Sequence, residues 1–150
     1  MADAYILCGF GVVHPWLCDA MGHLTTRHYL GFFDDASYQL FAALGHDAEA
    51  GKIAQQGWAD VRHEIDYRAE LAAGALVRID GRVVALGRSS ITTELRLLAR
   101  SDDRLCATLL ARTVCFDLAA RRSRLLPEAL VEQATVLFGV TPEQRSSPAA

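Results

Sequence analysis

The stretch Arg27-His-Tyr-Leu-Gly-Phe-Phe-Asp-Asp-Ala-Ser-Tyr-Gln-Leu-Phe-Ala-Ala-Leu44 decides the fold of this 150-residue chain. Its apolar residues recur at steps of three and four, as in an α-helix, and Gly45 follows where a left-handed C-terminal cap is expected. Past Arg27 and His28, only four polar residues interrupt its apolar surface: Asp34, Asp35, Ser37 and Gln39. A helix with so little polar surface is usually wrapped by other structure. We therefore expect a long helix over 27–44 that is buried against a sheet.

The apolar pattern changes to a period of two between Asp60 and Leu71. Acidic and basic residues hold the even positions, and the odd positions carry mostly apolar residues together with His63. Such alternation predicts a strand with one buried and one solvated face. It also favours His63 as a hydrogen-bonded core histidine over a catalytic one.

Further elements are expected on both sides of these two segments. The remaining strands are predicted at 5–13, 76–86, 90–100 and 105–118. A short helix over 47–55 and a C-terminal helix opened by Pro127 and ending near 137 are also expected. Four consecutive strands joined by short turns predict an antiparallel meander, whose apolar face only the long helix can cover. The expected fold is α+β, a five-stranded antiparallel sheet around one helix, with a domain at 1–140 and a frayed tail at 141–150.

The composition excludes several classes of function. Net charge is −3 with no basic stripe, so a nucleic-acid partner is not expected. The sequence has no apolar run long enough to span a membrane and no signal-peptide pattern at its start, which favours the cytoplasm. The high apolar content, 51%, favours a homo-oligomer. The four cysteines form no metal-binding spacing, so we expect buried thiols and no metal.

The loop before the long helix carries the residues most suited to chemistry. The carboxylate of Asp19 can act as nucleophile or base on a carbonyl held at the helix N-terminus, where the Thr26 N–H has no intrahelical partner. Gly22 can supply a turn with positive φ. His23 can orient Asp19, position water or protonate a leaving thiolate. This arrangement favours acyl transfer, and direct attack and attack through water both stay open.

Two further positions are weaker candidates. Arg88-Ser89-Ser90 follows a glycine at a strand junction, where it forms either a solvated turn or a contact to phosphate or pantetheine at a subunit interface. Asp34 and Asp35 lie on the otherwise apolar helix, and one of them facing inward would be a second candidate acid.

The motif Asp19-Ala-Met-Gly22-His23, followed by Tyr29-Leu30 and the order of elements, resembles hotdog-fold acyl-CoA thioesterases of the 4-hydroxybenzoyl-CoA thioesterase type. That family has an Asp three residues before a Gly and a Tyr ten after the Asp, and the chain matches all three positions. The resemblance implies a hotdog fold, Asp19 as nucleophile or base and the Thr26 N–H as oxyanion donor. It also implies coenzyme A bound across a homodimer interface, often within a homotetramer, with no separate cofactor. Many members carry two asparagines where this chain has Thr25 and Thr26.

A second resemblance concerns the acyl group. Pro15-Trp16, Gly22-His23 and Asp35-Ala36 are also similar to thioesterases associated with carnitine and betaine metabolism. This resemblance points to a small polar or cationic acyl group, against which Trp58 could form a cation–π wall. The substrate-binding residues expected are therefore Gly22, Tyr29, Trp58, Arg88, Ser89 and Ser90.

Two alternatives to hydrolysis stay open. A hotdog hydratase or dehydratase would need a His–acid dyad, for which His23 or His63 would serve. An acyl-CoA-binding or sensing module would use the same scaffold without turnover.

Overall fold

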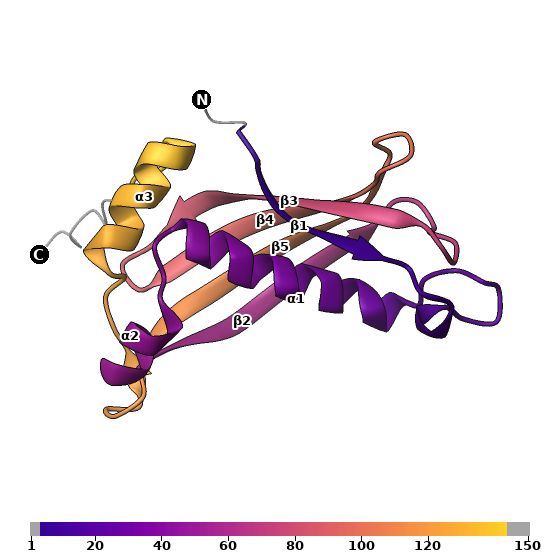
Figure 1. Cartoon of the computed structure of the whole chain (residues 1–150). Helices are drawn as coiled ribbons and strands as arrows, with labels where there is room; N and C mark the ends of the chain where they lie inside the picture. The colour runs from indigo at the N-terminus through magenta and orange to yellow at the C-terminus, as the bar shows by residue number, and fades with distance from the viewer. Residues whose placement is uncertain (1–3, 144–150) are drawn as a thin grey trace, which may run out of the picture.

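In the computed structural model, which describes residues 4–143, a curved antiparallel sheet curls around one long helix (Figure 1). Helix α1 spans Thr26–Ala43, one residue from the predicted start and end. The main strands, in sheet order, are β1 (Ile6–Val12), β3 (Leu76–Leu86), β4 (Ser90–Ala99), β5 (Leu105–Asp117) and β2 (Gln56–Tyr67). A two-residue strand β6, Arg122–Ser123, pairs with β5 and makes the sheet six-stranded rather than five-stranded. The predicted α+β class is confirmed.

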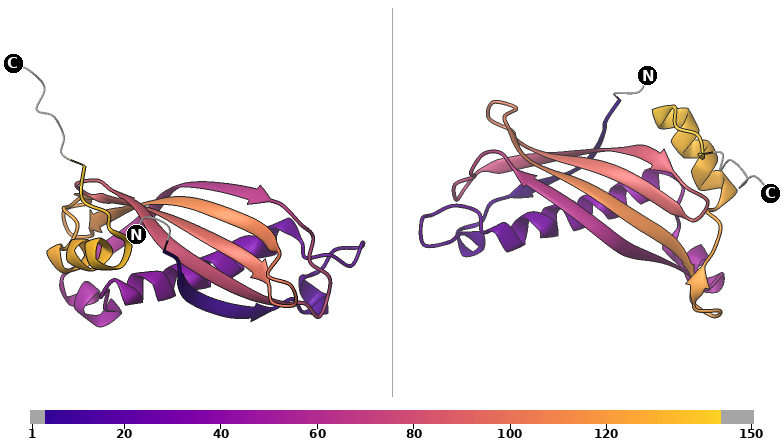
Figure 2. Two further views of the ribbon diagram at one scale, coloured as in Figure 1. Left: turned by 90° about the horizontal axis from the view of Figure 1, so that it is seen from above. Right: turned by 180° about the vertical axis from the view of Figure 1, so that it is seen from behind.

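Three short helices complete the described chain. Helix α2, Ala48–Ile53, is capped by the Asp47 side chain, which accepts a hydrogen bond from the Ala50 N–H at 2.9 Å. Helix α3, Glu128–Phe138, lies at the end of the sheet away from the N-terminus of α1 (Figure 2), and a 3-10 turn η1 occupies Pro15–Leu17. Past α3, the Glu143 N–H donates to the Leu86 carbonyl at 3.0 Å, so the start of the predicted tail lies against β3. The rest of that tail, 144–150, lies outside the described residues.

The strand connectivity differs from the predicted meander. Strands β2 and β3 follow one another in the chain, yet β2 pairs only with β5 and β3 pairs with β1 and β4. The segment 68–75 between them is too long for a tight hairpin turn, and Leu71 in it is bound to the loop before α1, since its carbonyl accepts from the Leu24 N–H at 2.7 Å. The connection therefore crosses the end of the sheet, and the prediction of four strands in simple succession is wrong.

Helix α1 fills the concave face of the sheet. Its buried side chains are Tyr29, Phe33, Ala36, Leu40 and Phe41. The backbone of the helix lies nearest β1, β3 and β4, while two of its rings meet rings of β2, Tyr29 with Tyr67 and Phe41 with Trp58. The core therefore lies between α1 and the sheet, and a cavity remains between α1 and β2.

Strand β2 carries a bulge that corrects the predicted alternation. Asp60 pairs with Thr113 and Arg62 with Arg112, so Val61 between them is unpaired. One extra residue shifts the side-chain alternation, which places both Asp60 and His63 on the side of the helix. The side chain of His63 is 29% exposed and 3.8 Å from the Asp60 carboxylate, so the prediction of a core histidine is wrong.

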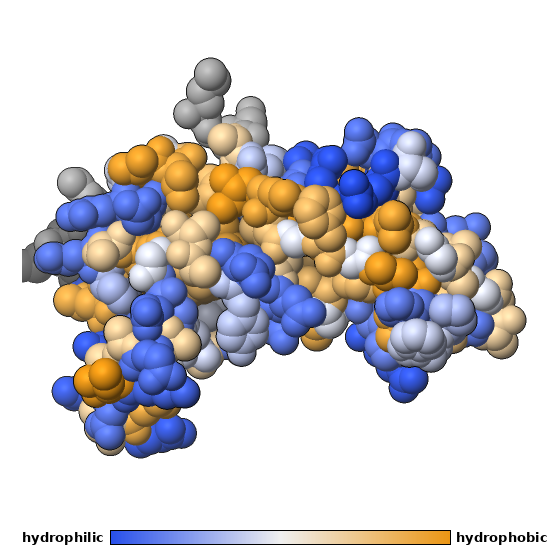
Figure 3. Space-filling view, viewed as in Figure 1, coloured by the Kyte–Doolittle hydropathy of each residue, from blue (hydrophilic) through white to orange (hydrophobic). Residues whose placement is uncertain are grey.

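Apolar side chains stay exposed on both edge strands. Leu7, Phe10 and Val12 of β1 are exposed, as are Val61 and Tyr67 of β2. Figure 3 shows apolar surface across the middle of the face on which β1 lies. No helix among residues 4–143 is long and apolar enough to cross a membrane.

Three of the four cysteines are buried, as predicted. Cys8, Cys106 and Cys115 are buried, and Cys18 is partly exposed. Burial raises the pKa of the Cys8 thiol to about 11, so this group stays protonated and unreactive near neutral pH.

The close approach of α1 to the sheet depends on Gly81, and we predict that Gly81→Ala destabilises the fold. A Cβ there would lie 2.5 Å from Leu95 Cδ2 and 3.3 Å from Leu40 Cδ2, and both leucines are fully buried. We expect a loss of about 1–3 kcal/mol in the free energy of unfolding, measured with urea. The matched control is Gly31→Ala on the exposed side of α1, where a Cβ meets nothing within 4 Å and should stabilise by about 0.5–1 kcal/mol. Equal stability of the two variants would contradict this packing.

Candidate active site

The loop before α1 forms a short hairpin. Cys18 and Leu24 pair as an antiparallel bridge, and the Asp19 N–H donates to the His23 carbonyl at 2.8 Å. Gly22 at the tip has φ of 78°, the left-handed conformation that glycine adopts without strain, as predicted. Asp19 therefore lies near the tip of the hairpin, and the base of the hairpin leads directly into α1.

The Asp19 carboxylate is held by one oxygen only. Oδ1 accepts from the Met21 N–H at 2.8 Å and from the His23 N–H at 3.2 Å. Oδ2 has no partner among the described residues, and the side chain is exposed. The two backbone bonds fix the direction of the carboxylate, which leaves Oδ2 available to a substrate.

The Thr26 N–H is a free donor at the start of α1. Thr25 is the N-cap residue, but its side chain makes no capping hydrogen bond. Within residues 4–143 no acceptor pairs with the Thr26 N–H. An unpaired N–H at the positive end of an 18-residue helix is suited to holding a developing oxyanion.

Within residues 4–143 the His23 imidazole pairs with Glu70 and makes no hydrogen bond or ion pair with Asp19. Its Nδ1 lies 3.3 Å from Glu70 Oε2, from the segment between β2 and β3. Three roles were predicted for the His23 side chain. The first, orientation of Asp19, is carried out by the His23 backbone N–H and not by the imidazole. The paired imidazole, 32% exposed, retains the other two: positioning water and carrying a proton.

Tyr29 is part of the core. It is 4% exposed, and its ring meets the Tyr67 ring edge-on with centroids 5.1 Å apart. Burial raises the pKa of its hydroxyl. Its predicted contact with substrate stays a prediction.

The other predicted residues lie at the opposite end of the sheet. Arg88 and Ser89 lie in the turn between β3 and β4, and Ser90 begins β4, beside α3, whereas the Asp19 hairpin lies beyond the N-terminus of α1 (Figure 1). With Thr92 and Arg112 this turn lines a cavity of about 320 Å³. Trp58 lies at the same end, near the start of β2. One copy of the chain does not bring the two groups together.

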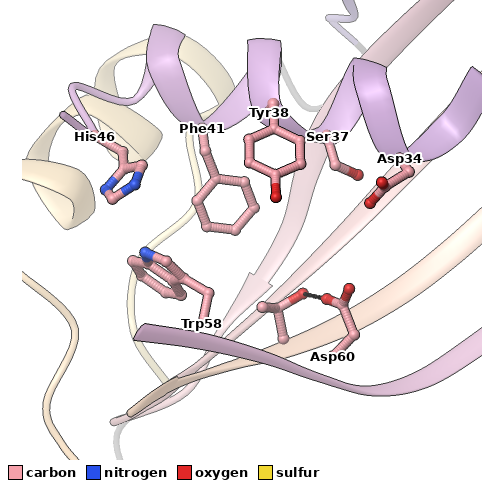
Figure 4. A pocket seen from close by; sticks show the side chains of 8 residues that line it. Asp34, Ser37, Tyr38, Phe41, His46, Trp58 and Asp60 are labelled. Carbon is pink, nitrogen blue, oxygen red and sulfur yellow. Dashed lines mark hydrogen bonds between the residues drawn. The ribbon is translucent and has the colours of Figure 1, made fainter. Parts of the chain in front are cut away.

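A second cavity lies between α1 and β2, and most of its residues were missed from the sequence (Figure 4). It has a volume of about 220 Å³ and is lined by Asp34, Ser37, Tyr38, Phe41, His46, Trp58, Asp60 and Thr113. The polar interruptions of the helix pattern signalled Asp34 and Ser37. The sequence did not indicate Asp60, because its side chain faces the helix only as a result of the bulge at Val61, which the alternating pattern does not show.

Metal binding has no evident site in the described part of the chain. No group of three or more His, Cys, Asp or Glu side chains there could hold a metal ion.

Comparison with known proteins identifies the family. Residues 13–134 match the model of the thioesterase-like superfamily, and the chain belongs to this superfamily. No curated protein matches the chain. Superfamily membership places it among the thioester hydrolases.

Three solved structures illustrate the similarity. A hypothetical protein from Staphylococcus aureus in complex with CoA superposes with a TM-score of 0.84 at 16% identity, over 99% of this chain and 92% of that one. The 1,4-dihydroxy-2-naphthoyl-CoA thioesterase from Synechocystis gives 0.78 at 14% identity, over 89% and 98%. A thioesterase from Thermus thermophilus complexed with coenzyme A and Zn gives 0.76 at 25% identity, over 91% and 97%. The fold is therefore the hotdog fold, and the narrower resemblances noted from the sequence stay predictions.

Proposed function

We propose that the chain is an acyl-CoA thioesterase that hydrolyses a small acyl-CoA to the carboxylic acid and free coenzyme A. The observation that carries this proposal is the pairing of a fixed carboxylate with a free donor: Asp19 Oδ2 is unpartnered near the hairpin tip, and the Thr26 N–H is unpartnered at the hairpin base. These are the nucleophile or base and the oxyanion donor that thioester hydrolysis needs.

The proposed reaction begins when the thioester oxygen accepts a hydrogen bond from the Thr26 N–H. Asp19 Oδ2 then either attacks the carbonyl carbon, which forms a mixed anhydride that water hydrolyses, or removes a proton from the water that attacks. In both routes the C–S bond breaks and the thiolate leaves with the electron pair. His23, oriented by Glu70, is the group in this loop suited to deliver a proton to that thiolate.

The turn at Arg88 supports a site for the phosphates of coenzyme A. Its cavity contains two arginines and three hydroxyl side chains, all of which suit phosphate oxygens, together with one carboxylate, that of Glu143. Because this turn and Asp19 lie at opposite ends of one chain, we propose that each complete site uses two copies.

The edge of β2 supports the same assembly. Strand β2 is twelve residues long, pairs with another strand on one side only, and exposes the side chains of Val61 and Tyr67. Exposed strand edges are surfaces for pairing with another chain. Two-fold antiparallel pairing of β2 with its own copy would bring the Asp19 end of one copy toward the Arg88 end of the other. A homodimer, or a dimer of dimers, is therefore proposed, and four unpaired cysteines fit the reducing cytoplasm.

One observation favours a second candidate, the hydratase or dehydratase. The structure has two histidine–acid pairs, His23 with Glu70 and His63 with Asp60. Water addition to an enoyl-CoA without thiol release would favour this alternative. Tight binding without any turnover would favour the binding module.

We predict that Asp19→Asn abolishes hydrolysis without unfolding the loop. Asparagine keeps the Oδ1 that accepts from the Met21 and His23 N–H groups, and it loses the charge that attacks or activates water. We expect kcat to fall at least about 100-fold, measured as thiol release from a panel of acyl-CoAs. Turnover equal to that of the unchanged chain would rule out this mechanism.

We predict that Arg88→Ala weakens recognition of coenzyme A specifically. Loss of a charge-assisted contact to phosphate should raise KM for acyl-CoA about tenfold and leave kcat nearly unchanged. The matched substrate is the corresponding acyl-pantetheine, which lacks the nucleotide and its phosphates. An equal effect on both substrates would show that the turn does not bind phosphate.

A further inference from the structure

The outer face of the sheet, on the side away from α1, carries arginines that pair with neighbouring acids. In the right-hand view of Figure 2 this face is turned toward the reader, and no helix of residues 4–143 crosses its middle. Arg78 Nε and Arg96 Nη2 each lie 3.2 Å from a carboxylate oxygen of Asp80. Arg82 Nη2 lies 3.2 Å from Glu94 Oε2. The guanidinium groups that β3 and β4 place on this face are therefore compensated by nearby carboxylates.

Strands β5 and β2 depart from this pattern at one place. Arg62 of β2 stands directly opposite Arg112 of β5, and like charges directly opposite one another destabilise a sheet. Arg62 pairs with Glu64, whereas the Arg112 side chain makes no hydrogen bond or ion pair within residues 4–143. A position that breaks a general rule of sheet stability without an evident compensating contact is expected to be functional.

Two cavities adjoin at Arg112. One is the cavity of about 320 Å³ at the Arg88 turn. The other has a volume of about 200 Å³ and is lined by Arg62, Glu64, Thr92, Leu110, Ala111 and Arg112. Thr92 and Arg112 line both cavities, and Leu110 gives the second an exposed apolar surface. The two cavities therefore follow one another along the outer face, from the Arg88 turn toward β2.

The spacing of the cavities suits two phosphate groups on one ribose. Ser90 lines the first cavity, and Thr92, which stands opposite Arg112, lies two residues further along β4, a distance of about 7 Å. Phosphates on the 5′ and 3′ oxygens of a ribose are separated by the sugar ring alone. A short step from one anion site to the next is what such a ligand requires.

We infer that Arg62 and Arg112 form a binding site for a phosphomonoester on the outer face of the sheet. A dianionic phosphate between the two guanidinium groups offsets their mutual repulsion and gives Arg112 the partner that it lacks. The Thr92 hydroxyl is a further donor in this cavity. Glu64, the acid of this lining, is already directed to Arg62.

The source of the phosphate rests on the proposed function. Coenzyme A carries a pyrophosphate on the 5′ oxygen of its ribose and a single phosphate on the 3′ oxygen. With the pyrophosphate at the Arg88 turn, the 3′-phosphate lies between Arg62 and Arg112, and the base can lie on Leu110. Thioesters of carriers without the 3′-phosphate are then poorer substrates. Pairing of β2 with a second copy uses its backbone edge and leaves both arginines on the outer face.

Binding is tested with two isomeric nucleotides, adenosine 3′,5′-bisphosphate and adenosine 5′-diphosphate. The two differ only in the position of the second phosphate. Titration calorimetry at about pH 8 keeps a phosphomonoester dianionic, and low ionic strength limits screening of exposed charges. Arg62→Gln should weaken binding of the bisphosphate about tenfold and change binding of the diphosphate by less than about twofold.

Arg100→Gln is the matched control. It removes the same charge beyond the other end of β4, where Arg100 lies over the Phe10 ring and lines neither cavity. This variant should bind both nucleotides as the unchanged chain does. Equal weakening of the two nucleotides by Arg62→Gln, or an equal loss in Arg100→Gln, would overturn the inference, because net charge alone would then account for binding.

Inorganic phosphate tests the other source of the same chemistry, a free phosphate ion. Its affinity should fall when coenzyme A is saturating, because the 3′-phosphate then occupies the site. Phosphate binding that Arg62→Gln weakens and that coenzyme A leaves unchanged would keep the phosphate site and overturn its assignment to coenzyme A.

Turnover separates this inference from the proposed function. The substrates are one acyl-CoA and the same acyl group on 3′-dephospho-CoA. Arg62→Gln should lower kcat/KM about tenfold for the first and leave the second nearly unchanged. Equal kcat/KM for both substrates in the unchanged chain would refute the assignment to the 3′-phosphate and leave the thioesterase standing. Binding of the bisphosphate that depends on Arg62, with no hydrolysis of either substrate, would refute the thioesterase and leave the phosphate site standing.

Discussion

Burial of helix α1 against the concave sheet is the interaction on which the rest of the structure depends. Leu40 and Phe33 are fully buried, and Leu40 packs over Gly81 of the sheet, where the missing Cβ leaves room for the side chains of Leu40, Leu95 and Cys8. Because the backbone of α1 lies nearest β1, β3 and β4, a cavity remains between the helix and β2. The same contact fixes the N-terminus of the helix, and with it the direction of the Thr26 N–H and the position of the Asp19 hairpin.

Most of the fold could be predicted because its strongest patterns are local. The 3.6-residue period predicted the bounds of α1 to within one residue, and the turn residues on either side of β3 did the same for that strand. The pairing of β2 with β5 could not be predicted, since partners far apart in sequence are chosen by long-range packing. The bulge at Val61 was also missed, because a single unpaired residue does not alter the composition of the strand. It nevertheless reverses the face of the sheet toward which every earlier side chain of the strand points.

In the candidate site, too, local arrangements could be predicted from the sequence and long-range contacts could not. Asp19, Gly22 and Thr26 could be predicted because one hairpin and one helix start determine their arrangement. The partner of His23 could not, because Glu70 reaches it from the crossover segment between β2 and β3. The aromatic and acidic cavity was missed since it combines Asp34 with Asp60, from elements that no local pattern joins. The central consequence of the proposed function concerns assembly: with the roles proposed for Asp19 at one end and the Arg88 turn at the other, both could act on one substrate only when two copies meet.

Complementation between two impaired chains tests that consequence most directly. One chain carries Asp19→Asn and the other carries Arg88→Ala with Arg112→Ala, each with its own affinity tag, and the mixed dimer is isolated through both tags. With sites shared between copies, one site of the mixed dimer contains both lesions and the other contains none. Hydrolysis of acyl-CoA below KM should then recover to about half that of the unchanged dimer. A mixed dimer as inactive as its parents would contradict the account, because each site would then lie within a single chain.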